Sequence, residues 1–240
     1  MRSFLRLTAI VLAIVAISGA KAGLPIEVEY GRGVNKVAIK LWTDAEEQLK
    51  KGDVEGARRN VDAAIRADPT VYPAFYTRAK VYMRLRKYEL AIQDASEALR
   101  QDRTFVEAAL LRAKLNGMLG RYDACLKEIN HVVAIKPRVD GRARAHADRA
   151  WLRATCPVAS FRNGKEAVKD ATFACKLMRW KDEDAIDTLA AAYAEAGDFD
   201  SAIRYEQQAM GMKDVSAEDA KVFQSHLESF KRHQPIRSSG

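Results

Sequence analysis

Residues 72–105 read YPAFYTRAKVYMRLRKYELAIQDASEALRQDRTF, and three alanines in this stretch outline a pair of helices. Ala79 is followed by Ala91 twelve positions later and by Ala98 seven positions after that. Because residues seven apart share a helix face, Ala91 and Ala98 belong to one helix and Ala79 to the helix before it. Small side chains at these places let two antiparallel helices approach closely.

The same small residues return at a 34-residue step on either side of this stretch. The preceding unit has Ala45, Ala57 and Ala64, and the following unit has Ala113, Cys125 and Val132. A fixed period of this length is typical of a helical solenoid. We therefore predict three consecutive helix pairs, over 38–71, 72–105 and 106–139.

Two further units follow these three. The last, 183–216, is predicted from Leu189, Ala190, Tyr193, Gly197, Phe199, Ala202 and Ala209. Before it lies a divergent unit, 143–181, in which Ala150 and Ala167 are 17 rather than 12 positions apart. The extra residues fall within 155–164, where Pro157 must end the first helix and Asn163-Gly164 suits the start of the second.

This period and its fixed positions resemble the tetratricopeptide-repeat family, and the last two units are similar to the ending of many exported bacterial members. The resemblance implies an all-α fold, a right-handed superhelical solenoid of antiparallel helix pairs with about five repeats over 38–216. We expect a C-terminal capping helix at 217–232, because terminal repeats need a polar outer face. Residues 233–240 have no apolar periodicity and are predicted to form a loose tail.

The first 22 residues have the pattern of a signal peptide. Arg2 and Arg6 precede an apolar run, Leu7–Ile17, and Ala20-Lys21-Ala22 fits a cleavage site. The run is shorter than the ~20 residues that span a bilayer. We therefore expect export, to the periplasm or outside the cell, with cleavage near Ala22. The leader or arm at 23–37 is left open between an extended arm and a disordered segment.

The chain is moderately basic, and one stretch concentrates the charge. The formal charge of +8 falls to +5 if Arg2, Arg6 and Lys21 are removed with the signal peptide. Residues 136–153 hold Lys136, Arg138, Arg142, Arg144, Arg149 and Arg153. This stretch is either a solvated helix face or a docking patch for an anionic partner, such as an acidic protein, a lipid headgroup or a cell-wall polymer. An export signal disfavours nucleic acid, and we do not favour a membrane surface.

The chain has three cysteines, Cys125, Cys156 and Cys175, for which two interpretations stay open. Cys125 and Cys175 fit small core positions, where cysteine behaves as a small hydrophobe. In an oxidising compartment, Cys125 and Cys156 would be the better placed pair for a disulfide.

No pattern in the sequence indicates an enzyme, a metal or a cofactor. The four histidines lack the spacing of metal-ligand motifs, and His226 and His233 are too far apart on one helix for a single ion. No glycine-rich phosphate loop is present, since the glycines fall at repeat turns. The acidic residues at 182–187 are typical of a helix N-terminus.

The resemblance also implies where a partner would bind, because the first helices of successive repeats line a concave groove in this family. Carried onto this chain, the groove positions combine aromatic residues, methionine and basic residues, which are typical of binding surfaces. The candidate contacts are Trp42, Tyr76, Lys80, Met83, Arg84, Lys114 and Trp151. Each of them can instead serve packing.

We therefore expect a non-enzymatic scaffold that binds a protein or an extended peptide in the periplasm or cell envelope. The alternative is a self-associating structural or assembly module that binds an anionic partner through residues 136–153. The sequence does not decide the oligomeric state.

Overall fold

The computed structural model describes residues 35–238 apart from 136 and 214. The described part contains eleven α-helices and a single 3₁₀ turn, without a strand. None of its helices is both long and apolar enough to cross a membrane. The expected signal peptide and most of the 23–37 segment lie outside the described residues. Helix bounds are α1 Lys36–Lys50, α2 Val54–Ala67, α3 Tyr72–Arg84, α4 Tyr88–Gln101, α5 Val106–Met118, α6 Tyr122–Ala134, α7 Val139–Thr155, α8 Gly164–Leu177, α9 Glu183–Glu195, α10 Phe199–Met210 and α11 Ala217–Lys231.

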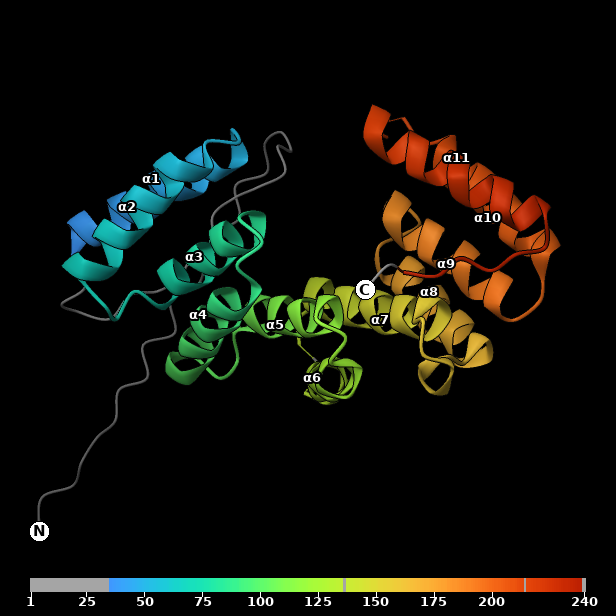
Figure 1. The fold of residues 1–240 in the computed structure, drawn as a ribbon, viewed down its shortest axis with the longest axis horizontal. Coiled ribbons are helices and arrows are strands. Elements are labelled where there is room, and N and C mark those ends of the chain that lie inside the picture. Colours follow the sequence, from blue (N-terminus) through green and yellow to red (C-terminus); the bar gives the residue numbers. More distant parts are fainter. Residues whose placement is uncertain (1–34, 136, 214, 239–240) are drawn as a thin grey trace, which may run out of the picture. The chain divides into compact units, whose positions relative to one another are not determined.

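The helices form an all-α solenoid of five pairs, α1–α2 to α9–α10, followed by α11 (Figure 1). Within each pair the two helices pack against each other, and the second helix also contacts the first helix of the next pair. The last helix, α11, packs mainly on α10 and also touches α9. Each unit therefore buries its surface against its neighbours, as expected of a solenoid.

The predicted small residues form the seams between these helices. The positions of the first helix are Ala45, Ala79, Ala113, Ala150 and Ala190, and those of the second are Ala57, Ala91, Cys125, Ala167 and Ala202, with Ala64, Ala98, Val132, Ala174 and Ala209 two turns later. All fifteen are buried, and none is more than 5 % exposed. The small residues therefore recur every 34 positions because the helices pack closely at these places.

The divergent unit departs from the others between its two helices. Helix α7 ends at Thr155, two residues before Pro157, and a 3₁₀ turn follows at Ala159–Phe161. Asn163 then caps α8, because its side chain accepts a hydrogen bond from the backbone N–H of Glu166 at 3.1 Å. A Cβ atom on Gly164 would lie 2.4 Å from the backbone nitrogen of Ala196. Glycine at 164 therefore lets α8 begin directly against the end of α9.

A recurring arginine joins three helices in each of the three middle units. Arg78 on α3 donates from Nε and Nη2 to both carboxylate oxygens of Asp94 on α4, at 2.7 and 2.8 Å, and from Nη1 to Asp62 on α2 at 3.1 Å. We name these contacts the arginine forks. The equivalent forks are Arg112 with Glu128 and Ser96, and Arg149 with Asp170 and Asn130. Each fork ties a unit to the second helix of the preceding one.

The C-terminal segment differs from the loose tail that its composition predicts. The backbone N–H of Ser238 donates to the carbonyl oxygen of Thr155 at 2.9 Å. Arg237 forms an ion pair with Glu195 at 2.8 Å, and Ile236 packs against the core around α9. The last turn of a helix leaves carbonyl oxygens without partners, and the segment satisfies one of them at the end of α7. Periodicity could not predict this docking, because single side chains and one backbone hydrogen bond hold the segment, without a repeating apolar pattern.

All three cysteines are free and buried. Burial raises the pKa of the Cys125 and Cys175 thiols to about 12. Cys125 and Cys156 belong to one apolar cluster, and the thiol of Cys175 donates to the carbonyl oxygen of Ala185 at 3.3 Å. All three cysteines therefore occupy core positions, Cys125 and Cys175 as protonated thiols.

Candidate functional site

The first helices of the middle units enclose a cavity of about 420 Å³, which we name the central groove. It brings together Tyr76, Lys80, Met83, Lys114 and Trp151 from the predicted contacts. The other lining residues are Glu107, Leu110, Leu111, Gly117, Met118, Tyr122, Cys125, Ile129, Arg144, Asp148, Leu152 and Ser238. The lining combines an apolar floor with charged side chains, which is the usual composition of a ligand site.

The repeat itself aligns the groove residues. Lys80 and Lys114 are 34 residues apart and therefore hold the same position on α3 and α5. Trp151 holds that position on α7, because it follows Ala150 as Lys114 follows Ala113. The side chains at this repeat position on three successive first helices thus all line the same groove.

One groove lysine is already neutralised. The Nζ atom of Lys80 lies 2.7 Å from each carboxylate oxygen of Glu46 on the preceding first helix. The same ammonium group lies 4.8 Å from the ring centroid of Tyr76. Lys80 therefore serves chiefly to join two repeats across the groove wall.

Two other basic residues keep their charge available to a ligand. Among the described residues, Lys114 and Arg144 form no ion pair within 4.0 Å. Asp148 lines the same groove, and its partly buried carboxyl group makes no hydrogen bond within the described part of the chain. Burial raises the pKa of Asp148 to about 6, against the opposing effect of Arg144 and Lys114. Lys114 and Arg144 thus share the groove lining with two acids, Glu107 and Asp148, and Asp148 titrates near neutral pH.

Two predicted contacts lie elsewhere. Trp42 is buried and donates from Nε1 to the hydroxyl oxygen of Thr77 at 2.9 Å, so that it joins α1 to α3. Arg84 is exposed and does not line the groove. Trp151 lines the groove and also lies beside α11, with its ring 6.1 Å from that of His226.

The basic stretch at 136–153 is divided between different surroundings. Arg149 and Arg153 both bind Asp170, at 2.7 and 2.6 Å, and Arg144 faces the groove. Arg142 lies over the ring of Phe173, and Lys136 lies outside the described residues. The stretch therefore does not form one continuous basic patch within the described part of the chain.

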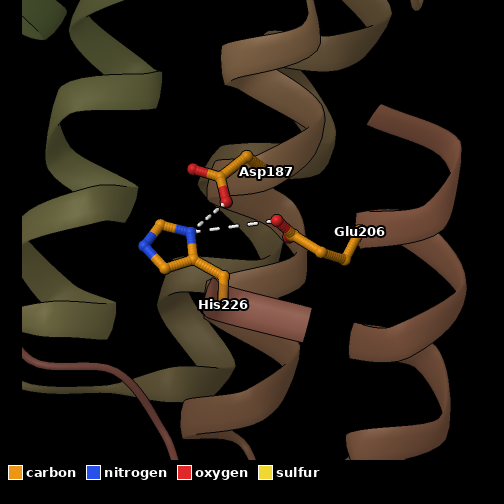
Figure 2. A group of neighbouring side chains, drawn as sticks. All are labelled: Asp187, Glu206 and His226. Carbon is orange, nitrogen blue, oxygen red and sulfur yellow. Dashed lines mark hydrogen bonds and ion pairs between the residues drawn. The ribbon is translucent and has the colours of Figure 1, made fainter. Parts of the chain in front are cut away.

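The structure also brings together three residues that the sequence reasoning missed as a group. Asp187 of α9, Glu206 of α10 and His226 of α11 meet inside the C-terminal end of the solenoid (Figure 2). His226 Nδ1 lies 2.7 Å from an Asp187 carboxylate oxygen and 3.8 Å from one of Glu206. We name these three residues the acid–histidine cluster. The sequence pattern of the acidic residues at 182–187 is typical of a helix N-terminus, but Asp187 contacts His226 inside the solenoid.

A signal for this cluster is present in the repeat. Glu206 follows Ala202 by four positions, and the residues four positions after the equivalent small residues are all apolar. They are Val61, Ala95, Ile129 and Ala171, and all are buried. Glu206 is the one ionisable residue in this series, and this exception is the sequence signal for the cluster. Burial raises the pKa of Glu206 to about 10, and the neighbouring Asp187 adds to this rise.

Comparison with known proteins concerns the repeat and the fold. The tetratricopeptide-repeat family model matches residues 72–105. No curated protein matches the chain.

Solved structures resemble the chain over most of its length. A thermophilic tetratricopeptide-repeat protein of Thermus thermophilus is 16 % identical, with a TM-score of 0.66 over 80 % of this chain and 99 % of its own. PilF of Pseudomonas aeruginosa is 15 % identical, with a TM-score of 0.65 over 83 % and 90 %. MamA of Desulfovibrio magneticus RS-1 is 16 % identical, with a TM-score of 0.58 over 76 % and 100 %. At these identities the similarity concerns the fold alone. The chain therefore contains a tetratricopeptide repeat at 72–105 and has the fold of a tetratricopeptide-repeat solenoid.

Proposed function

We propose that the protein is a non-enzymatic scaffold whose central groove binds an extended segment of a partner protein. The observation that carries this proposal is the composition of the groove, in which Lys114 and Arg144 stand free above an apolar floor. Free cations favour an acidic side chain or a carboxylate, and an apolar floor favours an aliphatic or aromatic anchor. Met83 and Met118 add side chains that adapt to different shapes.

The C-terminal segment supports an extended ligand. Its last described residue, Ser238, lines the groove, and the backbone N–H of Ser238 donates to the carbonyl oxygen of Thr155. A non-helical segment thus fits beside the end of α7 at the groove lining.

The test compares two charge reversals on an array of short peptides that vary in net charge and apolar content. We expect the parent protein to select acidic peptides with an apolar anchor. Lys114→Glu should weaken this binding by about tenfold or more, because it replaces a free cation in the groove. Arg84→Glu is the matched control, since Arg84 is exposed nearby and does not line the groove. Equal losses in both variants, or no peptide selection by the parent, would contradict the proposal.

We further propose that the protein is exported and acts in the periplasm or cell envelope. This rests on Arg2, Arg6, the apolar run that follows and the Ala20-Lys21-Ala22 sequence. Mass spectrometry of the protein from its own cells should find an N-terminus at Gly23. A cytosolic protein that retains its first 22 residues would refute it.

A further inference from the structure

The acid–histidine cluster contains an unusual buried carboxyl group. Glu206 is 0 % exposed, and neither of its side-chain oxygens has a hydrogen-bond partner that would stabilise a carboxylate. Figure 2 shows its carboxyl group directed at the imidazole of His226 and the carboxylate of Asp187. Burying a charged carboxylate is costly unless a positive charge compensates for it. No lysine or arginine within the described part of the chain forms an ion pair with Asp187 or Glu206.

A second histidine–aspartate pair in the same chain shows what is missing. His146 Nδ1 lies 2.8 Å from Asp170, and its side chain is 15 % exposed, as is that of His226. Asp170, however, also binds the guanidinium groups of Arg149 and Arg153. Asp187 has no such arginine among the described residues, and a second carboxyl group, that of Glu206, lies near the same imidazole instead. The cluster therefore has an excess of acceptors and a deficit of positive charge.

We propose that Asp187, Glu206 and His226 bind one divalent transition-metal ion of the Zn²⁺ class. A dication balances the two carboxylates and leaves the imidazole neutral, as a ligand requires. The donor set, one imidazole nitrogen and two carboxylate oxygens, suits Zn²⁺ and its transition-metal neighbours better than Mg²⁺ or Ca²⁺, which prefer oxygen alone.

The geometry is close to what such an ion needs. One ligand atom from each residue lies within 4.8 Å of the other two. Tetrahedral bonds of about 2.0–2.2 Å place ligand atoms roughly 3.3 Å apart. The separations from His226 Nδ1, 2.7 Å to Asp187 and 3.8 Å to Glu206, lie on either side of this value. Small side-chain rotations would therefore suffice, and water would complete the coordination.

The position of the site gives it a structural role. The three ligands come from α9, α10 and α11, so the ion would hold the last helix on the final repeat. His226 is the most exposed of the three, and the ion would enter on its side, beside Trp151.

The test is zinc binding by the full chain without an affinity tag, measured by calorimetry and by metal analysis after dialysis. We expect one Zn²⁺ per chain, no comparable binding of Mg²⁺, and a rise in the unfolding midpoint of about 5–10 °C at a hundredfold excess over Kd. Glu206→Gln and His226→Asn should each weaken binding by about a hundredfold or more. Glu206→Gln keeps the side-chain shape, and circular dichroism would verify that it folds.

His146→Asn is the matched control, because it removes a histidine of equal exposure from the other pair. It should bind Zn²⁺ as the parent does. The proposal is overturned if the parent binds no Zn²⁺ at tenfold molar excess. It is equally overturned if Glu206→Gln binds Zn²⁺ with unchanged affinity, or if His146→Asn loses as much affinity as His226→Asn.

Discussion

The middle of the solenoid and its C-terminal end solve the same packing problem with opposite chemistry. In the three middle units, an arginine fork lies between helices and gives a buried or half-buried acid a fixed cation. In the final unit, Leu189 holds the position of the arginine, and Tyr205 holds that of the acid. Tyr205 stacks on Tyr193 at 5.4 Å, and the polar group moves inward to Glu206. The comparison shows that one repeat backbone can hold an acid in two settings. In the middle units an arginine neutralises the acid, whereas in the final unit the negative charge of Glu206 has to be offset in another way.

The largest effect is expected from removing a cation in the middle region. Arg78→Ala would leave Asp94 buried beside Asp62 without its partner, and should lower the free energy of unfolding by about 3 kcal/mol. Urea unfolding followed by circular dichroism measures this. The double variant Arg78→Leu with Asp94→Leu should recover most of the loss. A single variant as stable as the parent would show that the forks do not compensate for buried charge.

A smaller loss is expected at the boundary between the two regions. Gly164→Ala should lower the free energy of unfolding by about 2 kcal/mol, because its Cβ would overlap the backbone of Ala196. Gly117→Ala is the control, since its Cβ would meet only the Cys125 sulfur at 3.5 Å. Thermal melts of the two variants should differ by several degrees. Equal melting temperatures would mean that α8 can shift away from α9 without cost.

In the C-terminal region, removing a buried carboxyl group should raise the stability instead of lowering it. Glu206→Met restores an apolar residue to the buried series and should raise the free energy of unfolding of the metal-free protein by about 1 kcal/mol. Unfolding in the presence of a chelator measures it. Loss of stability in this variant would show that the carboxyl group is well compensated by the protein alone, and the contrast between the regions would disappear.

Asp148 is intermediate between the acids paired with arginine and the acid–histidine cluster. Lys114 and Arg144 influence its carboxyl group without forming an ion pair with it. Its pKa, raised to about 6 by burial, means that it is largely protonated at pH 5 and ionised at pH 7. Loss of its negative charge leaves Lys114 and Arg144 freer for an acidic peptide, so affinity should rise roughly fivefold from pH 7 to 5. Fluorescence anisotropy at both values would test this. Asp148→Asn should bind tightly at both; a variant with the parent's pH dependence would assign the effect to another group.

Asp148 also affects stability in a direction that its pKa determines. A carboxyl group whose pKa is higher in the folded protein binds more protons there than in the unfolded chain. Its contribution to stability is therefore fully present below pH 4 and falls as the pH rises to about 6. Asp148→Asn should remove this fall, which makes stability measurements an independent check on the binding experiment.

How much could be predicted from sequence depends on whether the signal was periodic. The alanine positions predicted the all-α solenoid, and the non-standard spacing of Ala150 and Ala167 located the insertion, because close packing demands small residues at fixed places. The position of Tyr76 or Lys114 in the groove follows from the same period. Trp42 holds the equivalent position in its own repeat, but its indole is buried and donates a hydrogen bond to Thr77. The repeat position alone does not predict this contact between neighbouring helices.

Contacts between segments far apart in the chain could not be predicted from the sequence, for physical reasons. The docking of residues 236–238 combines a hydrogen bond to a carbonyl group at the end of α7 with single side-chain contacts of Ile236 and Arg237, none of which repeats along the chain. The acid–histidine cluster combines single residues from three helices, and only Glu206 departs visibly from a repeating pattern. Its partners could be named only when the angle of α11 on the final repeat was known.

The arginine forks carry a consequence for how the number of repeats can change during evolution. Each arginine reaches back to an acceptor that occupies the same place in the preceding unit, namely Asp62, Ser96 or Asn130. Excising residues 72–105, for example, would bring Arg112 against Asp62, which accepts a guanidinium group as well as Ser96 does. Removal of this regular unit would therefore leave the pattern of forks intact. Leu189 lacks a backward-reaching donor, so the final unit is committed to its place as the end of the array.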